Sequence, residues 1–191
     1  IRGQAVSDML TRPVSYDLIK LYAPYNEKDI RFTTFFTPKR KNQKEPVGRI
    51  RASEIHLMMA ECLAHKGSSQ DALDVINNLR ANRIEGYVPY TLETLPEVDK
   101  DAMIKVDALG KPLTRLTQAI LNERRMEMCL EGDRWFELKR NGGPEFTIIT
   151  DAIGIWQKYT MKTYMYTFPI NKDDVDLKDY LKQNEGYEEY L

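Results

Sequence analysis

The clearest hydrophobic pattern of the chain lies in residues 113–143. After Thr114, which is typical of a helix N-cap, apolar residues recur at spacings of three and four and form one stripe: Leu116, Ala119, Ile120, Met126 and Leu130. Gly132 suits a left-handed helix end, and Asp133 can cap a second helix from Arg134 to Arg140. The segment is therefore predicted to be a pair of core helices.

Two acidic residues fall inside this stripe. At 100° per residue, Glu123 and Glu127 lie among the apolar positions and not on the opposite, solvated face. A buried carboxylate is costly unless it is paired and hydrogen-bonded, and the planar fork of arginine suits both of its oxygens. We therefore predict a structural ion-pair core in which the two glutamates meet arginines that stand beside apolar runs: Arg49, Arg51, Arg80, Arg134 and Arg140.

Two carboxylates one helical turn apart are also typical of a general acid and base or of metal ligands. Acid–base pairs need a cleft and separate environments, whereas these residues are expected among arginines on a packed helix. The histidines, His56 and His65, lie on another predicted helix and belong to neither a Cys-x-x-Cys nor a His-Glu-x-x-His motif. We expect no catalytic residue, no metal site and no cofactor.

A helical hairpin is predicted for residues 49–83. A first helix, from about Ser53 to Lys66, ends at Gly67 and has an apolar face that is expected to be buried: Ile55, Met58, Met59, Cys62 and Leu63. Ser68 begins a capping-box pattern for a second helix, whose apolar face runs from Ala72 to Leu79. Two antiparallel helices with a short link are the unit that tetratricopeptide-type repeats stack.

The remaining segments are loop-rich. Residues 1–48 contain a short helical pattern around Ala5 and Met9, followed by loop with short extended pieces such as Phe32–Phe36. Residues 84–112 form a connector that is long for a compact domain, and such connectors often carry function. Residues 144–191 read as a loop-rich tail. The predicted fold class is mainly α, a tetratricopeptide-like hairpin scaffold with long irregular loops.

Composition and charge limit the number of domains and the classes of partner that the chain can have. The 191 residues, 42% of them hydrophobic, can bury the core of one domain. A net charge of -1 disfavours nucleic-acid and anionic-membrane surfaces, and the basic run from Lys39 to Lys44 is read as a solvated turn and not as an anion site. Cys62 and Cys129 lie on or beside apolar stripes and are expected to be buried thiols, with a disulfide between them as the alternative.

Five blocks of sequence carry a family resemblance: RIRASEIHLMMAECLAHKG, INNLRANR, AILNERRMEMCLEGDRWFELKRNG, YTFPINKDDV and LKQNEGY. In this order they resemble the C-terminal half of the SusD/RagB family of outer-membrane nutrient-binding lipoproteins from Bacteroidetes. The match covers most of the chain. YNEKDIR, at residues 25–31, is similar to the loop that precedes the first helix of that half.

The resemblance implies a SusD-like scaffold whose N-terminal half and lipidated cysteine are absent from this chain. It implies a surface-exposed protein of the outer membrane, attached to the membrane only through that anchor. The expected activity is the non-catalytic binding of nutrient oligo- or polysaccharides for delivery to a SusC-like TonB-dependent transporter. A peptide-binding member of the family, a soluble helical-repeat adaptor and a glycoside hydrolase using Glu123 and Glu127 are the alternatives.

Sugar binding favours aromatic residues in the non-helical segments. Pyranose rings offer flat C–H faces that stack on Tyr and Trp, which supply contact area at little rotamer cost. The ligand contacts predicted on this basis are Tyr87, Tyr90, Trp156 and Tyr159. The alternative for each is an aromatic plug over the core. Glycan sites vary in position within the family, so the resemblance assigns no ligand residue.

Overall fold

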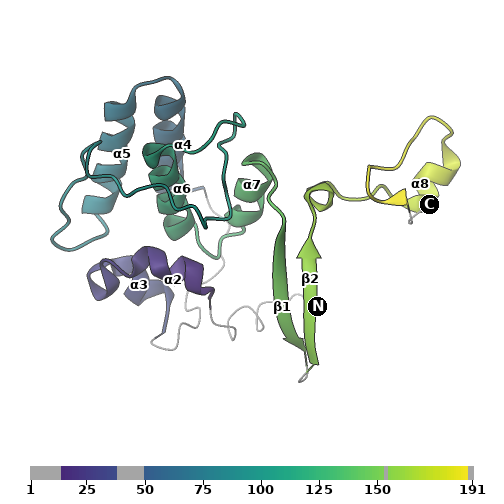
Figure 1. Cartoon of the computed structure of the whole chain (residues 1–191), viewed down its shortest axis with the longest axis horizontal. Helices are drawn as coiled ribbons and strands as arrows, with labels where there is room; N and C mark the ends of the chain where they lie inside the picture. The colour runs from purple at the N-terminus through teal and green to yellow at the C-terminus, as the bar shows by residue number, and fades with distance from the viewer. Residues whose placement is uncertain (1–13, 38–49, 153–154, 189–191) are drawn as a thin grey trace. The chain divides into compact units, whose positions relative to one another are not determined.

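A computed structural model describes residues 14–37, 50–152 and 155–188 of the chain. In chain order the elements are the helices and strands α2 (Tyr16–Tyr22), η1 (Asn26–Lys28), α3 (Ile30–Phe35), α4 (Ala52–His65), α5 (Ser69–Ala81), α6 (Arg115–Glu127), α7 (Asp133–Arg140), β1 (Phe146–Ala152), β2 (Ile155–Met161), η2 (Thr163–Tyr166) and α8 (Lys172–Leu177) (Figure 1). The predicted mainly helical fold class is confirmed. In the described part of the chain, no helix combines the length and the apolar character needed to cross a membrane.

The chain divides into two compact units. The first comprises residues 1–100 and 112–136, and the second comprises residues 101–111 and 137–191. In the first unit, α4 and α5 form the predicted hairpin, and α6 packs against both (Figure 1). The turn between α4 and α5 contains Gly67 at φ +86°, a left-handed conformation that favours glycine. Side chains from all three helices and from the connector between α5 and α6 form one cluster: Ala60, Ala72, Leu73, Ile76, Leu95, Leu116 and Ile120.

Only part of the predicted face of α4 packs, because Leu63 contacts the core cluster while most of that face is exposed. Leu57 and Ala60 are buried, while Ile55, Met58 and Met59 are 51%, 43% and 45% exposed. Ala60 belongs to the cluster formed with α5 and α6, so its small side chain marks the side on which these helices approach. Cys62 is exposed, as are Ile55, Met58 and Met59, so the prediction that its thiol is buried was wrong. Cys129 is buried, and no disulfide joins the two.

The lead-in is more helical than predicted. Ser15 accepts a hydrogen bond from the Leu18 backbone at 3.3 Å and so caps α2, and Asp29 caps α3 by accepting from the Arg31 backbone at 3.0 Å. The aromatic run read as extended belongs to α3 and its end, where its rings pack on Tyr22 and on side chains from the end of α6. Tertiary packing therefore overrides the strand preference of aromatic residues. The pattern around Ala5 and the basic run Lys39–Lys44 lie outside the described residues.

In the second unit, β1 and β2 form an antiparallel hairpin that begins with Phe146 opposite Met161. The tail is held by amide side chains. The Gln183 amide bonds both backbone groups of Ile170, at 2.8 and 2.9 Å, and Asn184 Nδ2 donates to the Phe168 carbonyl at 2.7 Å. The Phe-Pro-Ile and Gln-Asn sequence blocks are thus tied to each other across a loop.

Candidate functional site

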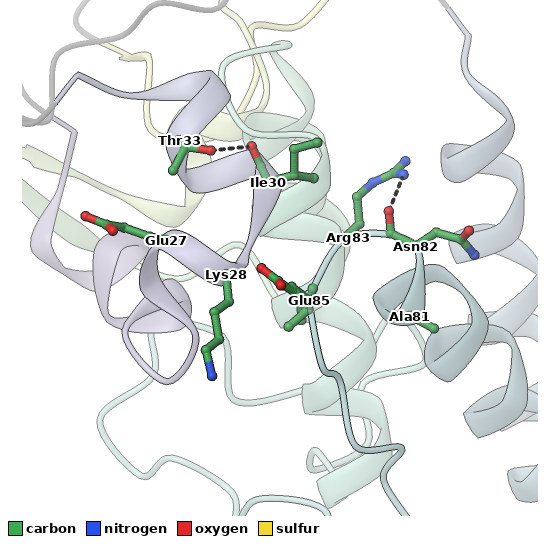
Figure 2. A pocket seen from close by; sticks show the side chains of 9 residues that line it. Glu27, Lys28, Ile30, Thr33, Ala81, Asn82, Arg83 and Glu85 are labelled. Carbon is green, nitrogen blue, oxygen red and sulfur yellow. Dashed lines mark hydrogen bonds between the residues drawn. The ribbon is translucent and has the colours of Figure 1, made fainter.

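An open pocket of about 400 Å³ lies in the first unit, between the start of α3 and the end of α5 (Figure 2). Its lining combines charged, amide, hydroxyl and apolar side chains: Glu27, Lys28, Ile30, Thr33, Ala81, Asn82, Arg83, Ile84 and Glu85. The two segments are joined by an antiparallel bridge between Asp29 and Ile84. The Ile30 amide donates to the Arg83 carbonyl, and the Glu85 amide donates to the Lys28 carbonyl, each at 2.9 Å.

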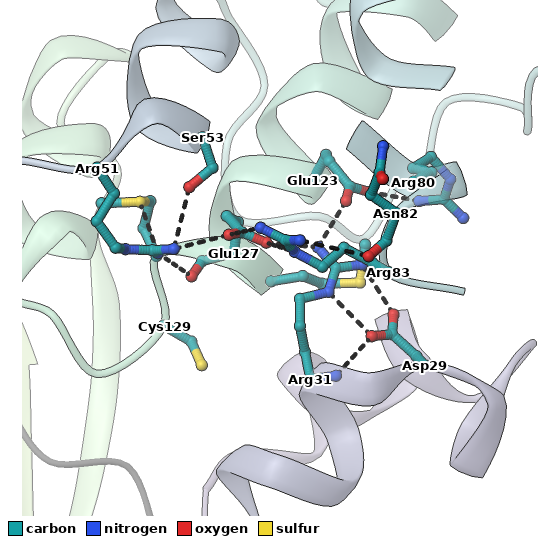
Figure 3. A network of polar contacts seen from close by, with 12 residues as sticks. Asp29, Arg31, Arg51, Ser53, Arg80, Asn82, Arg83, Glu123, Glu127 and Cys129 are labelled. Atoms are coloured by element: carbon teal, nitrogen blue, oxygen red, sulfur yellow. Dashed lines mark hydrogen bonds and ion pairs between the residues drawn. The ribbon is translucent and has the colours of Figure 1, made fainter. Parts of the chain in front are cut away.

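Behind this pocket lies a network of buried ion pairs (Figure 3). Its acidic and basic side chains are equal in number, and they come from the lead-in, from the segment before α4, from the end of α5 and from α6 and its C-terminal end: Asp29, Glu123, Glu127, Glu131, Arg31, Arg51, Arg80 and Arg83. We call this set the ion network. Because each charge has an opposite partner, the network can be buried without a net charge.

Glu123, like Asp29, is fully buried in the ion network. Its side chain is 0% exposed, and each of its carboxylate oxygens accepts from a different arginine. Arg31 Nη1 lies 2.6 Å from Oε1, and Arg80 Nη1 donates to Oε2. Glu123 therefore joins α3 and α5 to α6.

Glu127, one turn later, accepts from three arginines. Arg51 Nη1 lies 2.8 Å from Oε1, and Arg83 engages both oxygens with Nη2 and Nε at 3.0 and 3.1 Å. Arg31 Nη1 lies 3.2 Å from Oε2. Burial by itself raises the pKa of Glu127, but hydrogen bonds from Arg83 and Arg51 outweigh it and lower the pKa to about 2.

Arg31 links the lead-in to α6. Its Nε and Nη2 atoms hold the Asp29 carboxylate at 3.0 and 2.8 Å, and its Nη1 atom reaches both glutamates of α6. Burial opposes the charge of Arg31, but the carboxylates of Glu123 and Asp29 raise its pKa above the usual range. The guanidinium is therefore charged at neutral pH.

This geometry decides between the two interpretations of the acidic pair. A general acid or base must come within hydrogen-bond reach of a substrate proton. Glu123 and Glu127 are 0% and 1% exposed, and arginines occupy their oxygens. The pair holds together segments that lie far apart in the sequence, which is a structural role.

Three tyrosines surround the buried Arg80. The Arg80 guanidinium carbon lies 5.1 Å from the ring centres of Tyr25 and Tyr87 and 4.9 Å from that of Tyr90. Tyr87 donates to Asn77 Oδ1 at 2.7 Å, and Asn77 Nδ2 donates to the Tyr90 carbonyl at 2.9 Å. We call Tyr25, Tyr87 and Tyr90 the tyrosine cluster. Burial raises the pKa of both Tyr87 and Tyr90, so both hydroxyls keep their protons.

The structure brings together only some of the residues predicted from the sequence. Tyr87 and Tyr90 meet in the first unit, whereas Tyr159 belongs to β2 of the second unit and is 54% exposed. The Trp156 side chain lies outside what the structure describes. Among the predicted arginines, Arg51 and Arg80 belong to the ion network.

The other predicted arginines differ from the expectation or fall outside the description. Arg140 is exposed on α7, and Arg134 is only half-buried there, because the inward face of this helix presents Glu137 and Leu138. Arg49 lies outside the described residues. Sequence reasoning missed Asp29, Arg31, Arg83 and Glu131. The string YNEKDIR carried the signal for the first two, since Asp29 can cap a helix and bind Arg31 two positions later.

Comparisons with known proteins place this geometry in a family. The model of the SusD family matches residues 20–187, in agreement with the family predicted from the sequence blocks. No curated protein matches the chain. The solved structure of BT4246 is 22% identical and covers 72% of this chain and 23% of its own, with a TM-score of 0.47. Its selenomethionine form is 20% identical and covers 80% and 27%, with a TM-score of 0.49. The chain thus spans about a quarter of the length of these structures.

Proposed function

The chain belongs to the SusD family, and on that premise we propose that it takes part in binding nutrient molecules at the bacterial outer membrane. The proposed nutrient is an oligo- or polysaccharide, which the protein binds without chemical change and passes to a SusC-like TonB-dependent transporter. The observation that carries this proposal is the family match over residues 20–187. The protein that contains this chain is proposed to be exposed on the cell surface.

The ion network argues against a hydrolytic role for Glu123 and Glu127. A glycoside hydrolase that used Glu123 and Glu127 would need one carboxyl group in contact with the glycosidic oxygen and the other near the sugar ring. Both side chains are instead buried and bonded to arginine. The low pKa of Glu127 also opposes the role of a proton donor at neutral pH.

The tyrosine cluster supports a glycan as the ligand. Tyr87 and Tyr90 are half-buried, and Asn77 and Arg80 hold them in place, so little further side-chain entropy is lost when a sugar stacks on them. Both hydroxyl groups remain protonated, and because the Tyr87 hydroxyl already donates to Asn77, it can only accept from a sugar hydroxyl. In the second unit, Trp156 and Tyr159 stay predicted contacts.

Calorimetry tests the proposed function on the protein as its gene encodes it, titrated with neutral oligosaccharides, acidic oligosaccharides and peptides. We expect binding of an oligosaccharide, and we expect Tyr87→Ala and Tyr90→Ala each to weaken it about tenfold or more, the equivalent of ~1.4 kcal/mol. Tyr87→Phe, which keeps the ring and loses the bond to Asn77, should weaken it less. Tyr16→Ala is the control, because this tyrosine is 69% exposed on α2.

Several outcomes would contradict the proposal. Binding of peptides alone would show that the ligand is a peptide and not a glycan. Hydrolysis of the oligosaccharide during the titration would show that the protein is an enzyme. Equal affinity in all four tyrosine variants would remove the tyrosine cluster from the site. Cell fractionation provides the remaining test, since a cytoplasmic location of the full gene product would favour a soluble helical-repeat adaptor.

A further inference from the structure

We propose that the open pocket between α3 and α5 binds one or two units of a neutral, hydroxyl-rich ligand, and that the nutrient oligosaccharide supplies them. The inference rests on the proposed function and deepens it, because it locates a polar subsite that is distinct from the aromatic contacts. Four features of the pocket carry it: rigid walls, balanced charge, planar polar groups and an apolar patch.

The walls of the pocket are held in place before a ligand arrives. Backbone hydrogen bonds at 2.9 Å on either side of the Asp29–Ile84 bridge join the two segments that form it. Arg83, which lines the pocket, is fixed from behind by two bonds to Glu127, at 3.0 and 3.1 Å. A fixed donor lowers the entropy that binding would otherwise lose.

The charges of the lining favour a neutral ligand. Glu27 and Glu85 offset Lys28 and Arg83 in number. The pairing of Arg83 with Glu127 further reduces the positive potential at the pocket, so the pocket presents no positive excess to an anion. A phosphate or a polyuronate would need such an excess, because a carboxylate in the lining repels it.

Planar polar groups are suited to neighbouring hydroxyls. Figure 2 shows Asn82, Arg83 and Glu85 around one part of the pocket, with Arg83 Nη1 donating to the Asn82 carbonyl at 3.3 Å. The Glu85 carboxylate can accept from two adjacent hydroxyls of a sugar. The Asn82 amide can accept from one hydroxyl and donate to another with the Nδ2 hydrogen that does not bond the Asn78 carbonyl. The exposed side chains of Asn82 and Glu85 are accessible for this purpose.

Size and apolar surface fit a short stretch of glycan. A volume of about 400 Å³ lies near the lower end of the roughly 300–1,000 Å³ that is usual for small-ligand sites. Ile30, 59% exposed, and Ala81 offer carbon surface to the C–H groups of a sugar ring. The same two chain segments also carry the tyrosine cluster, since Tyr25 precedes Glu27 by two positions and Tyr87 follows Glu85 by two.

Variants of exposed residues test the subsite without disturbing the ion network. Ala81→Trp fills the pocket, and the double variant Asn82→Ala/Glu85→Ala removes its planar groups. Asp74→Ala is the matched control, because Asp74 is exposed two turns earlier on α5 and does not line the pocket. The probes are neutral di- to hexasaccharides of glucan, mannan, xylan and galactan, oligogalacturonides, and peptides, each titrated by calorimetry into the protein as its gene encodes it.

We expect the control to bind a neutral oligosaccharide as the unmodified protein does, and both pocket variants to bind it at least about tenfold more weakly. Circular dichroism should show that both variants fold like the control. The double variant should melt at a somewhat lower temperature, because it loses the bond from Asn82 Nδ2 to the Asn78 carbonyl at 2.8 Å. If Tyr87→Ala weakens binding and the pocket variants do not, the subsite is overturned and the proposed function stands. A preference for oligogalacturonides or peptides that the pocket variants abolish would overturn the neutral ligand class. If the protein binds no oligosaccharide, the proposed function fails and the subsite fails with it.

Discussion

Helices α4 and α6 carry similar apolar periodicity, yet only α6 buries the face that this periodicity marks. The α6 face contains two glutamates that are 0% and 1% exposed, while on α4 the residues Ile55, Met58 and Met59 are about half exposed. The face with charges is thus buried and the purely apolar one is not. A hydrophobic stripe therefore shows which residues share a face, and the neighbouring elements decide whether that face is covered.

The cause lies in what each face offers to its neighbours. Glu123 and Glu127 attract arginines from the lead-in, from the segment before α4 and from the end of α5, so three segments converge on α6. On α4, close approach of α5 and α6 requires a small side chain, and Ala60 provides it on the opposite side from the methionines. Four predictions test this contrast.

The largest effect is expected for Glu123→Ala. If only apolar burial mattered, alanine would be tolerated on this face. Removal of the carboxylate instead leaves Arg31 and Arg80 buried with less compensation, and we expect the free energy of unfolding to fall by about 3–5 kcal/mol. Chemical denaturation measures it. Glu97→Ala is the control, because Glu97 is 86% exposed and pairs with Arg115 only at 3.6 Å. Equal losses in the two variants would refute the role of the ion network.

The second-largest effect is expected from a comparison of two adjacent residues of α4. Leu57 is 1% exposed and Met58 is 43% exposed. We expect Leu57→Ala to lower the free energy of unfolding by about 2–4 kcal/mol, because it leaves a cavity, and Met58→Ala to lower it by roughly 0.5 kcal/mol or less. Urea titration of both variants provides the comparison. A larger loss for Met58→Ala would mean that the predicted stripe is the packed face after all.

Acidic pH should reduce the stability that the α6 face contributes and should not affect the contribution of the apolar α4 face. The folded-state pKa of Glu127 is about 2, below its usual value of 4.5. A depressed pKa contributes stability above the unfolded-state pKa, and this contribution is lost as the pH falls from about 4.5 toward 2. We expect a contribution on the order of 2 kcal/mol, measured as the difference in pH dependence between the unmodified protein and Glu127→Gln. If the free energies of unfolding of the two proteins changed in parallel between pH 4.5 and 2, the low pKa of Glu127 would be contradicted.

The smallest effect concerns how the two helices begin. Thr114 and Thr117 form a reciprocal capping box at the start of α6, with Thr117 N donating to Thr114 Oγ1 at 3.1 Å. At the start of α4, Arg51 makes no side-chain cap, because a guanidinium has no acceptor for the first N–H groups of the helix, and it binds Glu127 and Glu131 instead. We expect Thr114→Ala to lower the melting temperature by the equivalent of about 1 kcal/mol. Thr33→Ala, at an exposed position of α3, is the control. An equal shift of the melting temperature in the two variants would show that the cap at Thr114 adds no stability.

Local pattern was enough to predict the helical hairpin, the α6–α7 segment and the inward direction of Glu123 and Glu127. Arg51 and Arg80 were identifiable because each stands beside an apolar run. The same reasoning did not find Arg31, whose partners lie 92 and 96 positions away. It also placed Arg140 in the core, because periodicity alone does not show that α7 turns Glu137 and Leu138 inward.

The lead-in and the pocket were beyond local pattern for a related reason. Phe32 to Phe36 resemble a strand in composition, and only packing on Tyr22 and α6 makes them helical. The pocket is formed by two segments about fifty positions apart along the chain, and no periodicity links Lys28 to Glu85. Features that depend on distant pairing therefore need coordinates, while features that depend on helix faces do not.

The separation of Arg31 from Glu123 also has a consequence during synthesis. A ribosome that adds roughly 5–20 residues per second needs about 5–18 seconds to extend the chain across the 92 positions between them. In the later part of that interval, once Ala81 has been added, α4 and α5 can form their local contacts, whereas α3 has no carboxylate on α6 to bind. We expect the hairpin to form early and the lead-in to dock last, once the nascent polypeptide has delivered α6.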